Sequence, residues 1–147
     1  MAQGDGGQSS GMTTHQDLAV FSTTVPARAE HLAPLRRRVW GWLDGLRVPT
    51  PVRQDVVLAA HEALSDAIDQ PREGRDTTVS LLWDREVVVL TAVDHFTWTA
   101  RAQHGDQPGE RRLRAIARIA ERVDLDVDDE QGTLTAYFAV PPTDTGR

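Results

Sequence analysis

The stretch Thr50-Pro-Val-Arg-Gln-Asp-Val-Val-Leu-Ala-Ala-His-Glu-Ala-Leu-Ser-Asp-Ala-Ile-Asp69 decides how this chain folds. Thr50 followed by Pro51 predicts a helix start, because a threonine side chain caps free amides and a proline at the first helical position loses only an N–H without a partner. The apolar residues recur at helical spacing, so they predict one buried stripe. Its members are Val56, Ala60, Ala63, Leu64, Ala67 and Ile68.

A second stripe of the same helix is acidic. Asp55, Glu62, Asp66 and Asp69 share one face by the helical period. Glu62 and Asp66 lie one turn apart, and like charges at this spacing cost a few tenths of a kcal/mol. The stretch therefore predicts a buried amphipathic helix, with either a solvated acidic face or a site along its acidic edge.

Length and composition exclude several classes of protein. The 147 residues correspond to one domain, and the absence of cysteine excludes a disulfide framework, a cysteine nucleophile and thiolate zinc sites. The five histidines lack the spacing of metal ligands, and a net charge of −6 argues against a general nucleic-acid or anionic-membrane binder. Neither a membrane-spanning apolar run nor a secretory signal is visible, so we expect a soluble cytoplasmic protein.

The residues before the central helix predict a tail, a strand and a first helix. Residues 1–16 are rich in Gly, Ser, Gln and Thr and have little to bury, which predicts disorder. Asp17–Val25 predicts a strand that Pro26 ends. Apolar residues at helical spacing predict a helix from about Glu30 to Asp44, with Gly45 just past its end.

After the central helix, Thr77–Trp83 and Glu86–Asp94 predict two strands joined by a tight hairpin at Asp84-Arg85. The second of these strands is apolar on both faces and therefore predicts a central position in the sheet. The remaining prediction is a helix over 110–122, strands over 123–127 and 132–140, and a flexible tail over 141–147.

The predicted third helix has two stripes. Leu113, Ile116, Ala117 and Ala120 form an apolar one, and Arg111, Arg114, Arg118 and Arg122 form a basic one. The basic stripe is either a solvated face or a contact for an acidic partner. The element order β-α-α-β-β-α-β-β over residues 17–140 predicts an α+β two-layer sandwich: a mixed, largely antiparallel sheet with three helices on one face.

Three segments carry a recognisable pattern: Glu62-Ala-Leu-Ser-Asp66, Asp94-His-Phe-Thr-Trp98 and Gly109-Glu-Arg-Arg-Leu113. With the element order, they resemble the GHKL (Bergerat-fold, histidine-kinase-like) ATPases, specifically the RsbW-type anti-sigma-factor serine kinases. The resemblance covers Leu18–Val140. It implies ATP or ADP with Mg²⁺ as cofactor, a sigma factor and an anti-anti-sigma factor as protein partners, and a homodimer.

The resemblance also implies roles for single residues. Glu62 stands at the position of the family's general base, and Asp94 at that of the aspartate that holds the adenine amine. Asp66 replaces the asparagine that binds Mg²⁺ and phosphate; it keeps an oxygen ligand for the metal but loses the amide donor.

The glycine motifs depart from the family pattern. Phe96 and Trp98 stand where the family has glycines that bring the backbone close to the nucleotide. Gly109 and Leu113 match the turn that opens the third helix, whereas Arg112 replaces the glycine before the leucine. A helix N-terminus still offers amides to phosphate, and Arg111 or Arg112 would add charge-assisted contacts.

Three hypotheses follow. The first is a pseudokinase that regulates a sigma factor by protein contact alone. The second is an active Mg-ATP-dependent serine kinase, in which Glu62 takes the proton from a serine hydroxyl of an anti-anti-sigma factor. The third is a sensor that holds a small ligand in the vacated nucleotide pocket. The eroded glycine motifs and Asp66 favour the first.

Overall fold

The computed structural model of the 147-residue chain describes residues 18–69, 76–94, 107–127 and 131–142, with the side chains of 107–110 left out. The predicted tail over 1–16, residues 143–147 of the predicted C-terminal tail, and the segment with Phe96 and Trp98 lie outside the described residues. The elements are β1 (Ala19–Pro26), a 3₁₀ turn η1 (Ala29–His31), α2 (Leu32–Gly45), α3 (Thr50–Ile68), β2 (Asp76–Trp83), β3 (Val87–Asp94), α5 (Gln107–Ile119), β4 (Arg122–Val127) and β5 (Gly132–Ala139).

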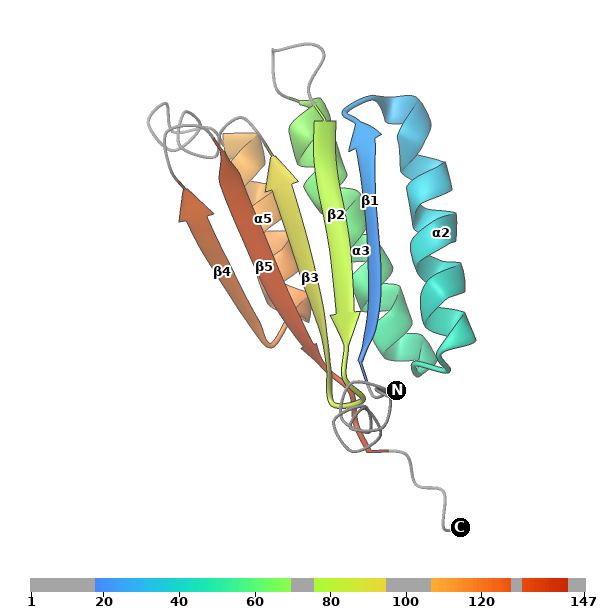
Figure 1. Cartoon of the computed structure of the whole chain (residues 1–147). Helices are drawn as coiled ribbons and strands as arrows, with labels where there is room; N and C mark the ends of the chain where they lie inside the picture. Colours follow the sequence, from blue (N-terminus) through green and yellow to red (C-terminus); the bar gives the residue numbers. More distant parts are fainter. Residues whose placement is uncertain (1–17, 70–75, 95–106, 128–130, 143–147) are drawn as a thin grey trace, which may run out of the picture.

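The described strands form one five-stranded sheet in the order β1-β2-β3-β5-β4. All four pairings are antiparallel, where the sequence allowed a mixed sheet. β3 lies at the centre, as its two apolar faces predicted. The helices α2, α3 and α5 cover one face of the sheet (Figure 1), so the α+β two-layer prediction is confirmed.

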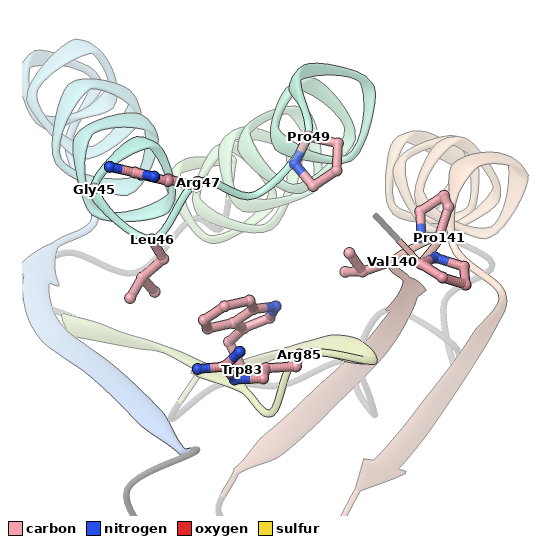
Figure 2. A pocket seen from close by; sticks show the side chains of 9 residues that line it. Gly45, Leu46, Arg47, Pro49, Trp83, Arg85, Val140 and Pro141 are labelled. Atoms are coloured by element: carbon pink, nitrogen blue, oxygen red, sulfur yellow. The ribbon is translucent and has the colours of Figure 1, made fainter. Parts of the chain in front are cut away.

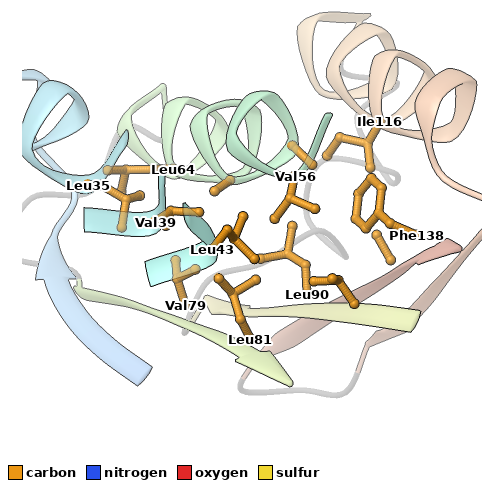
Figure 3. Packing of buried hydrophobic residues seen from close by; sticks show 14 of the residues in the cluster. Leu35, Val39, Leu43, Val56, Leu64, Val79, Leu81, Leu90, Ile116 and Phe138 are labelled. Atoms are coloured by element: carbon orange, nitrogen blue, oxygen red, sulfur yellow. The ribbon is translucent and has the colours of Figure 1, made fainter. Parts of the chain in front are cut away.

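The hydrophobic core fills the space between the helices and the sheet (Figure 3). From α3 it takes the predicted stripe, with Val56, Ala60 and Leu64 fully buried and Ile68 half-buried. Burying a leucine or valine side chain contributes about 1.5–3 kcal/mol. The apolar stripe therefore holds α3 in place, while Glu62 and Asp69 stay outside the core. No helix in the described part of the chain is long and apolar enough to cross a membrane.

The start of α3 differs from the prediction. The helix begins at Thr50 itself, Pro49 is the N-cap residue, and no side chain caps the first turn. The carbonyl of Pro49, held in extended backbone at ψ 144°, accepts the N–H of Arg53 at 2.9 Å. Capping by Thr50 is therefore wrong, because the chain enters the helix one residue earlier.

The end of α2 also differs, because Gly45 belongs to the helix and Arg47 makes the left-handed turn at φ 63°. The N–H of Val48 bonds the carbonyl of Leu43 at 3.1 Å, and the N–H of Arg47 bonds that of Asp44 at 2.9 Å. This pattern is a Schellman motif, with a hydrophobic contact expected between the residues at its two ends. Val48 and Leu43 are both fully buried, so core packing selects this turn.

The third helix, α5, begins and ends earlier than predicted. Gly109 lies inside the helix and not in a turn before it, and Arg122 is the first residue of β4. Of the predicted apolar stripe, Ile116 is buried, Leu113 is half-buried and Ala117 is exposed, because only a narrow side of α5 packs on the core. The arginines at 111, 114 and 118 are exposed, as predicted.

Candidate functional site

Buried polar side chains gather at one end of the molecule. Within the described ranges they are Ser65 and Asp66 near the end of α3, Thr77 at the start of β2 and Asp94 at the end of β3. Asp94 pairs with Thr77 on one side and with Gly132 on the other. Figure 1 shows the end of α3, the start of β2, the end of β3 and the start of α5 at this same end.

Two of these side chains are carboxylates. Asp66 is 1% exposed and Asp94 4% exposed, although burying a carboxylate is costly. The Thr77 hydroxyl beside them is buried with no hydrogen-bond partner in the described part of the chain. Polar groups buried at a cost tend to mark functional sites. The fold thus brings Asp66 and Asp94 to one end, although the sequence places them in separate elements.

Arg112 of α5 joins two members of the acidic stripe of α3. One guanidinium nitrogen (Nη1) donates to Glu62 Oε1 at 3.0 Å. The other terminal nitrogen and Nε donate to Asp69 Oδ2 at 2.7 and 3.1 Å. The Glu62 side chain is only 20% exposed, so α5 covers this edge of α3 and the solvated-face interpretation does not describe Glu62.

The charge of Arg112 is fixed by these contacts. Partial burial acts to lower its pKa, but the hydrogen bonds to Asp69 and Glu62 outweigh burial, so the pKa of Arg112 is raised above its ordinary value. The group stays a cation under all ordinary conditions. Two carboxylates therefore share one permanent counter-ion.

His61 lies beside Glu62 and contacts the other neighbouring helix. Its Nδ1 lies 2.9 Å from a guanidinium nitrogen of Arg36 on α2, so Nδ1 accepts this hydrogen bond. Burial lowers the pKa of His61, and the positive charges of Arg36 and Arg112 lower it further, against an opposing effect of Glu62. The imidazole is thus held in its neutral form between two arginines.

The remaining predicted site residues take less central places. Arg111 is exposed, Leu113 is half-buried against the core, and Gly109 lies within the first turn of α5. Asp69 was predicted only as a member of the acidic stripe, without a role of its own, and Thr77 was not predicted as a site residue. The helical spacing that put Asp69 on the face of Glu62 was the signal for it; Thr77 carried no signal.

Two of the residues that the resemblance assigns to the magnesium nucleotide are paired or buried in the described part of the chain. The guanidinium of Arg112 forms an ion pair with Glu62, and the side chain of Asp66 is buried. No group of three or more His, Cys, Asp or Glu side chains in the described ranges could hold a metal ion. Mg²⁺ bound with a nucleotide usually takes one or two protein carboxylates and completes its shell with phosphate oxygens and water, and Asp66 is the carboxylate that the resemblance assigns to it.

Comparison with known proteins identifies the class. Residues 25–138 match the sequence profile of the Histidine kinase-like ATPase domain, so the chain belongs to this family. The structure is similar to the crystal structure of the RsbU and RsbW domains of Rv1364c from Mycobacterium tuberculosis, with a TM-score of 0.65 and 16% identity over 85% of this chain. The match spans 34% of that chain, and at this identity it shows the fold alone. No curated protein matches the sequence.

Proposed function

We propose that this chain is an anti-sigma-factor-like regulator that binds a sigma factor or an anti-anti-sigma partner and has weak or no serine kinase activity. The observation that carries the proposal is the pairing of Arg112 with Glu62 and Asp69. A general base must accept a proton from the substrate hydroxyl. A carboxylate engaged by a guanidinium directs its lone pairs to that cation, in a charge-assisted hydrogen bond.

The surface of α5 supports a protein partner. Arg111, Arg114 and Arg118 are exposed on one helix of a chain whose net charge is −6. A local positive surface on an acidic protein favours approach by an acidic partner surface and speeds the encounter. The same helix carries Arg112, so a partner bound on α5 would lie next to the ion pairs of Arg112 with Glu62 and Asp69.

An active kinase is the second candidate, and one observation favours it. The side chains of Arg112 and Asp69 are 28% and 41% exposed. Ion pairs this accessible contribute on the order of 1 kcal/mol or less. A bound triphosphate could therefore attract Arg112 away from Glu62, which would free the carboxylate to accept a serine proton while Mg²⁺ neutralises the phosphates.

Titration with Mg-ATP distinguishes the two candidates. We expect the unmodified protein to give no saturable binding heat up to about 1 mM ATP. Most enzymes have KM values below about 1 mM, so binding of ordinary strength would be detected in this range. Arg112→Gly should bind ATP more tightly than the unmodified protein. Arg111→Gly is the matched control, because it places a glycine at the adjacent position of α5 and weakens the helix equally; it should bind ATP less tightly than Arg112→Gly. Saturable binding by the unmodified protein, with phosphate transferred to a partner serine, would establish the kinase instead.

The partner is tested separately. Each sigma factor and each candidate antagonist from the same genome is co-expressed with the protein, and the complexes are measured by size-exclusion chromatography with light scattering. We expect a complex that forms without nucleotide and persists in Glu62→Ala. The same experiment measures whether the free protein is the homodimer that the resemblance implies. If none of these candidates binds, the regulator proposal fails.

A further inference from the structure

A cavity of about 450 Å³ lies at the end of the molecule opposite Arg112. It is formed by the end of α2, the residue before α3, the β2–β3 hairpin and the residues that follow β5. Its volume is within the range of small-molecule sites. Pro49 lines the cavity, and Arg112 binds Glu62 and Asp69 farther along α3, so the two sites are separated by roughly 20 to 30 Å.

The lining of the cavity combines polar surface with apolar side chains around the indole of Trp83. Figure 2 shows the indole of Trp83 extending from β2 into the space between Leu46, Pro49 and Val140. The indole nitrogen Nε1 is buried and has no hydrogen-bond partner in the described part of the chain. A buried donor without an acceptor is costly, which favours an acceptor atom beside this indole.

Two arginines border the cavity, and both are held in unusual backbone conformations. Arg47 (φ 63°) and Arg85 (φ 82°) are the non-glycine residues with positive φ within the described ranges, and both line this one cavity. Glycine suits such positions better than any residue with a side chain. Strained non-glycine residues cluster at ligand-binding sites, so an arginine at each of these positions points to a role for its side chain.

The charged residues that line the cavity are both basic. The described residues that line the cavity include two arginines and no acidic residue, in a chain whose net charge is −6. Arg85 also lies over the Trp83 ring, with its guanidinium carbon 6.0 Å from the ring centroid. Guanidinium groups recognise carboxylates with paired N–H donors, and aromatic and proline surfaces suit an apolar body.

We propose that this cavity binds a small amphipathic carboxylate. The apolar part lies against Trp83, Leu46 and Val140, and the carboxylate pairs with the arginines of the lining, Arg47 and Arg85. Nothing in this binding requires the nucleotide site or the partner surface of α5, so the cavity is a second and separate site of the chain.

The test follows the indole N–H signals of the full chain by NMR, with the Trp83 signal assigned through Trp83→Phe. The probe is phenylacetate, and phenylacetamide is its neutral match. We expect phenylacetate to shift the Trp83 signal saturably below about 10 mM, and phenylacetamide to bind about tenfold more weakly, the effect of losing about 1.4 kcal/mol at a charged contact.

Arg47→Gln and Arg85→Gln should each weaken phenylacetate binding by about tenfold. Arg37→Gln, which removes an exposed arginine of α2 away from the cavity, is the control and should leave the affinity unchanged. Equal binding of acid and amide, an equal effect of Arg37→Gln, or no saturable shift of the Trp83 signal would each overturn the proposal.

Discussion

Glu62 and Asp69 share a single guanidinium, and this arrangement determines the charge at the α3–α5 end. With Arg112 in place, the three groups carry one net negative charge, and both carboxylates have a fixed partner. Exchange of Arg112 for a neutral residue would leave two acids, seven residues apart along α3 and its end, without this counter-ion. A cation, whether Mg²⁺ or a partner's side chain, would then be the natural replacement.

His61 makes stability depend on pH. Its pKa lies below the ordinary 6.5 in the folded protein, because of burial first and of Arg36 and Arg112 next, with Glu62 opposing. As pH falls below the unfolded value, the unfolded chain takes up the proton first, so stability decreases until the folded pKa is passed. Stability should therefore be lower at about pH 5 than at about pH 7.5.

Urea unfolding of the unmodified protein and of His61→Gln at both pH values measures this contribution. Glutamine keeps an acceptor for Arg36 but does not titrate. The pH dependence should be smaller in His61→Gln than in the unmodified protein, and His31→Gln serves as the control for losing a histidine elsewhere. An identical pH dependence in the unmodified protein and in His61→Gln would contradict the assignment.

At the scale of elements, the turn after α2 stores strain at Arg47. A left-handed conformation costs an L-residue about 1–2 kcal/mol, whereas glycine adopts it freely but loses about 0.5–1 kcal/mol through its flexible unfolded state. Arg47→Gly should therefore stabilise the fold by up to about 1 kcal/mol. Arg37→Gly, inside α2, should destabilise it by about 1 kcal/mol. Urea midpoints of the two variants test this, and similar destabilisation by both would show that the Arg47 side chain makes stabilising contacts.

The helix α5 is held to the fold by few side chains. Between residues 111 and 119 Ile116 is fully buried, while Leu113 and Ile119 are half-buried and Arg112 supplies the ion pairs to α3. The helix α3 has many more buried residues. Amide hydrogen exchange should therefore be faster in α5 than in α3, because local opening follows the number of buried contacts.

Arg112→Gln should accelerate exchange in α5 by about fivefold, the effect of losing roughly 1 kcal/mol of ion pairing, and leave α3 unchanged. Arg111→Gln is the matched control. The measurement is amide hydrogen exchange by mass spectrometry, with the exchange rates of α5 and α3 peptides compared between the two variants. Equal acceleration by both substitutions would mean that Arg112 does not hold α5.

At the scale of the whole molecule, the periodic patterns of the sequence predicted the helices, the strands and their arrangement in two layers. The apolar periods of α2 and α3 and the two apolar faces of β3 were enough to predict two layers and the central strand. They did not predict that Arg47 closes α2, since this turn depends on the packing of Val48 against Leu43. Nor did they predict that Arg112 bonds Glu62, because that contact depends on how α5 docks on α3. Residues that meet across elements required the tertiary structure.

The last prediction concerns the two ends of the molecule, which α3 joins over roughly 28 Å, given its 19 residues. Substitutions this far apart without shared contacts are additive within about 0.5 kcal/mol. Arg47→Gly is expected to stabilise and Arg112→Gln to destabilise, the latter by about 1 kcal/mol. The double variant should therefore show the sum of the two single effects in urea unfolding.

A coupling energy beyond about 0.5 kcal/mol in this double-mutant cycle would contradict independence. In that case α3 would transmit a structural change at one of its ends to the other end. A carboxylate bound beside Trp83 would in that case change how firmly Arg112 holds α5, and so change the partner surface that α5 presents. With additivity, the cavity and the Arg112 site are two separate sites, and each must be explained by its own ligand.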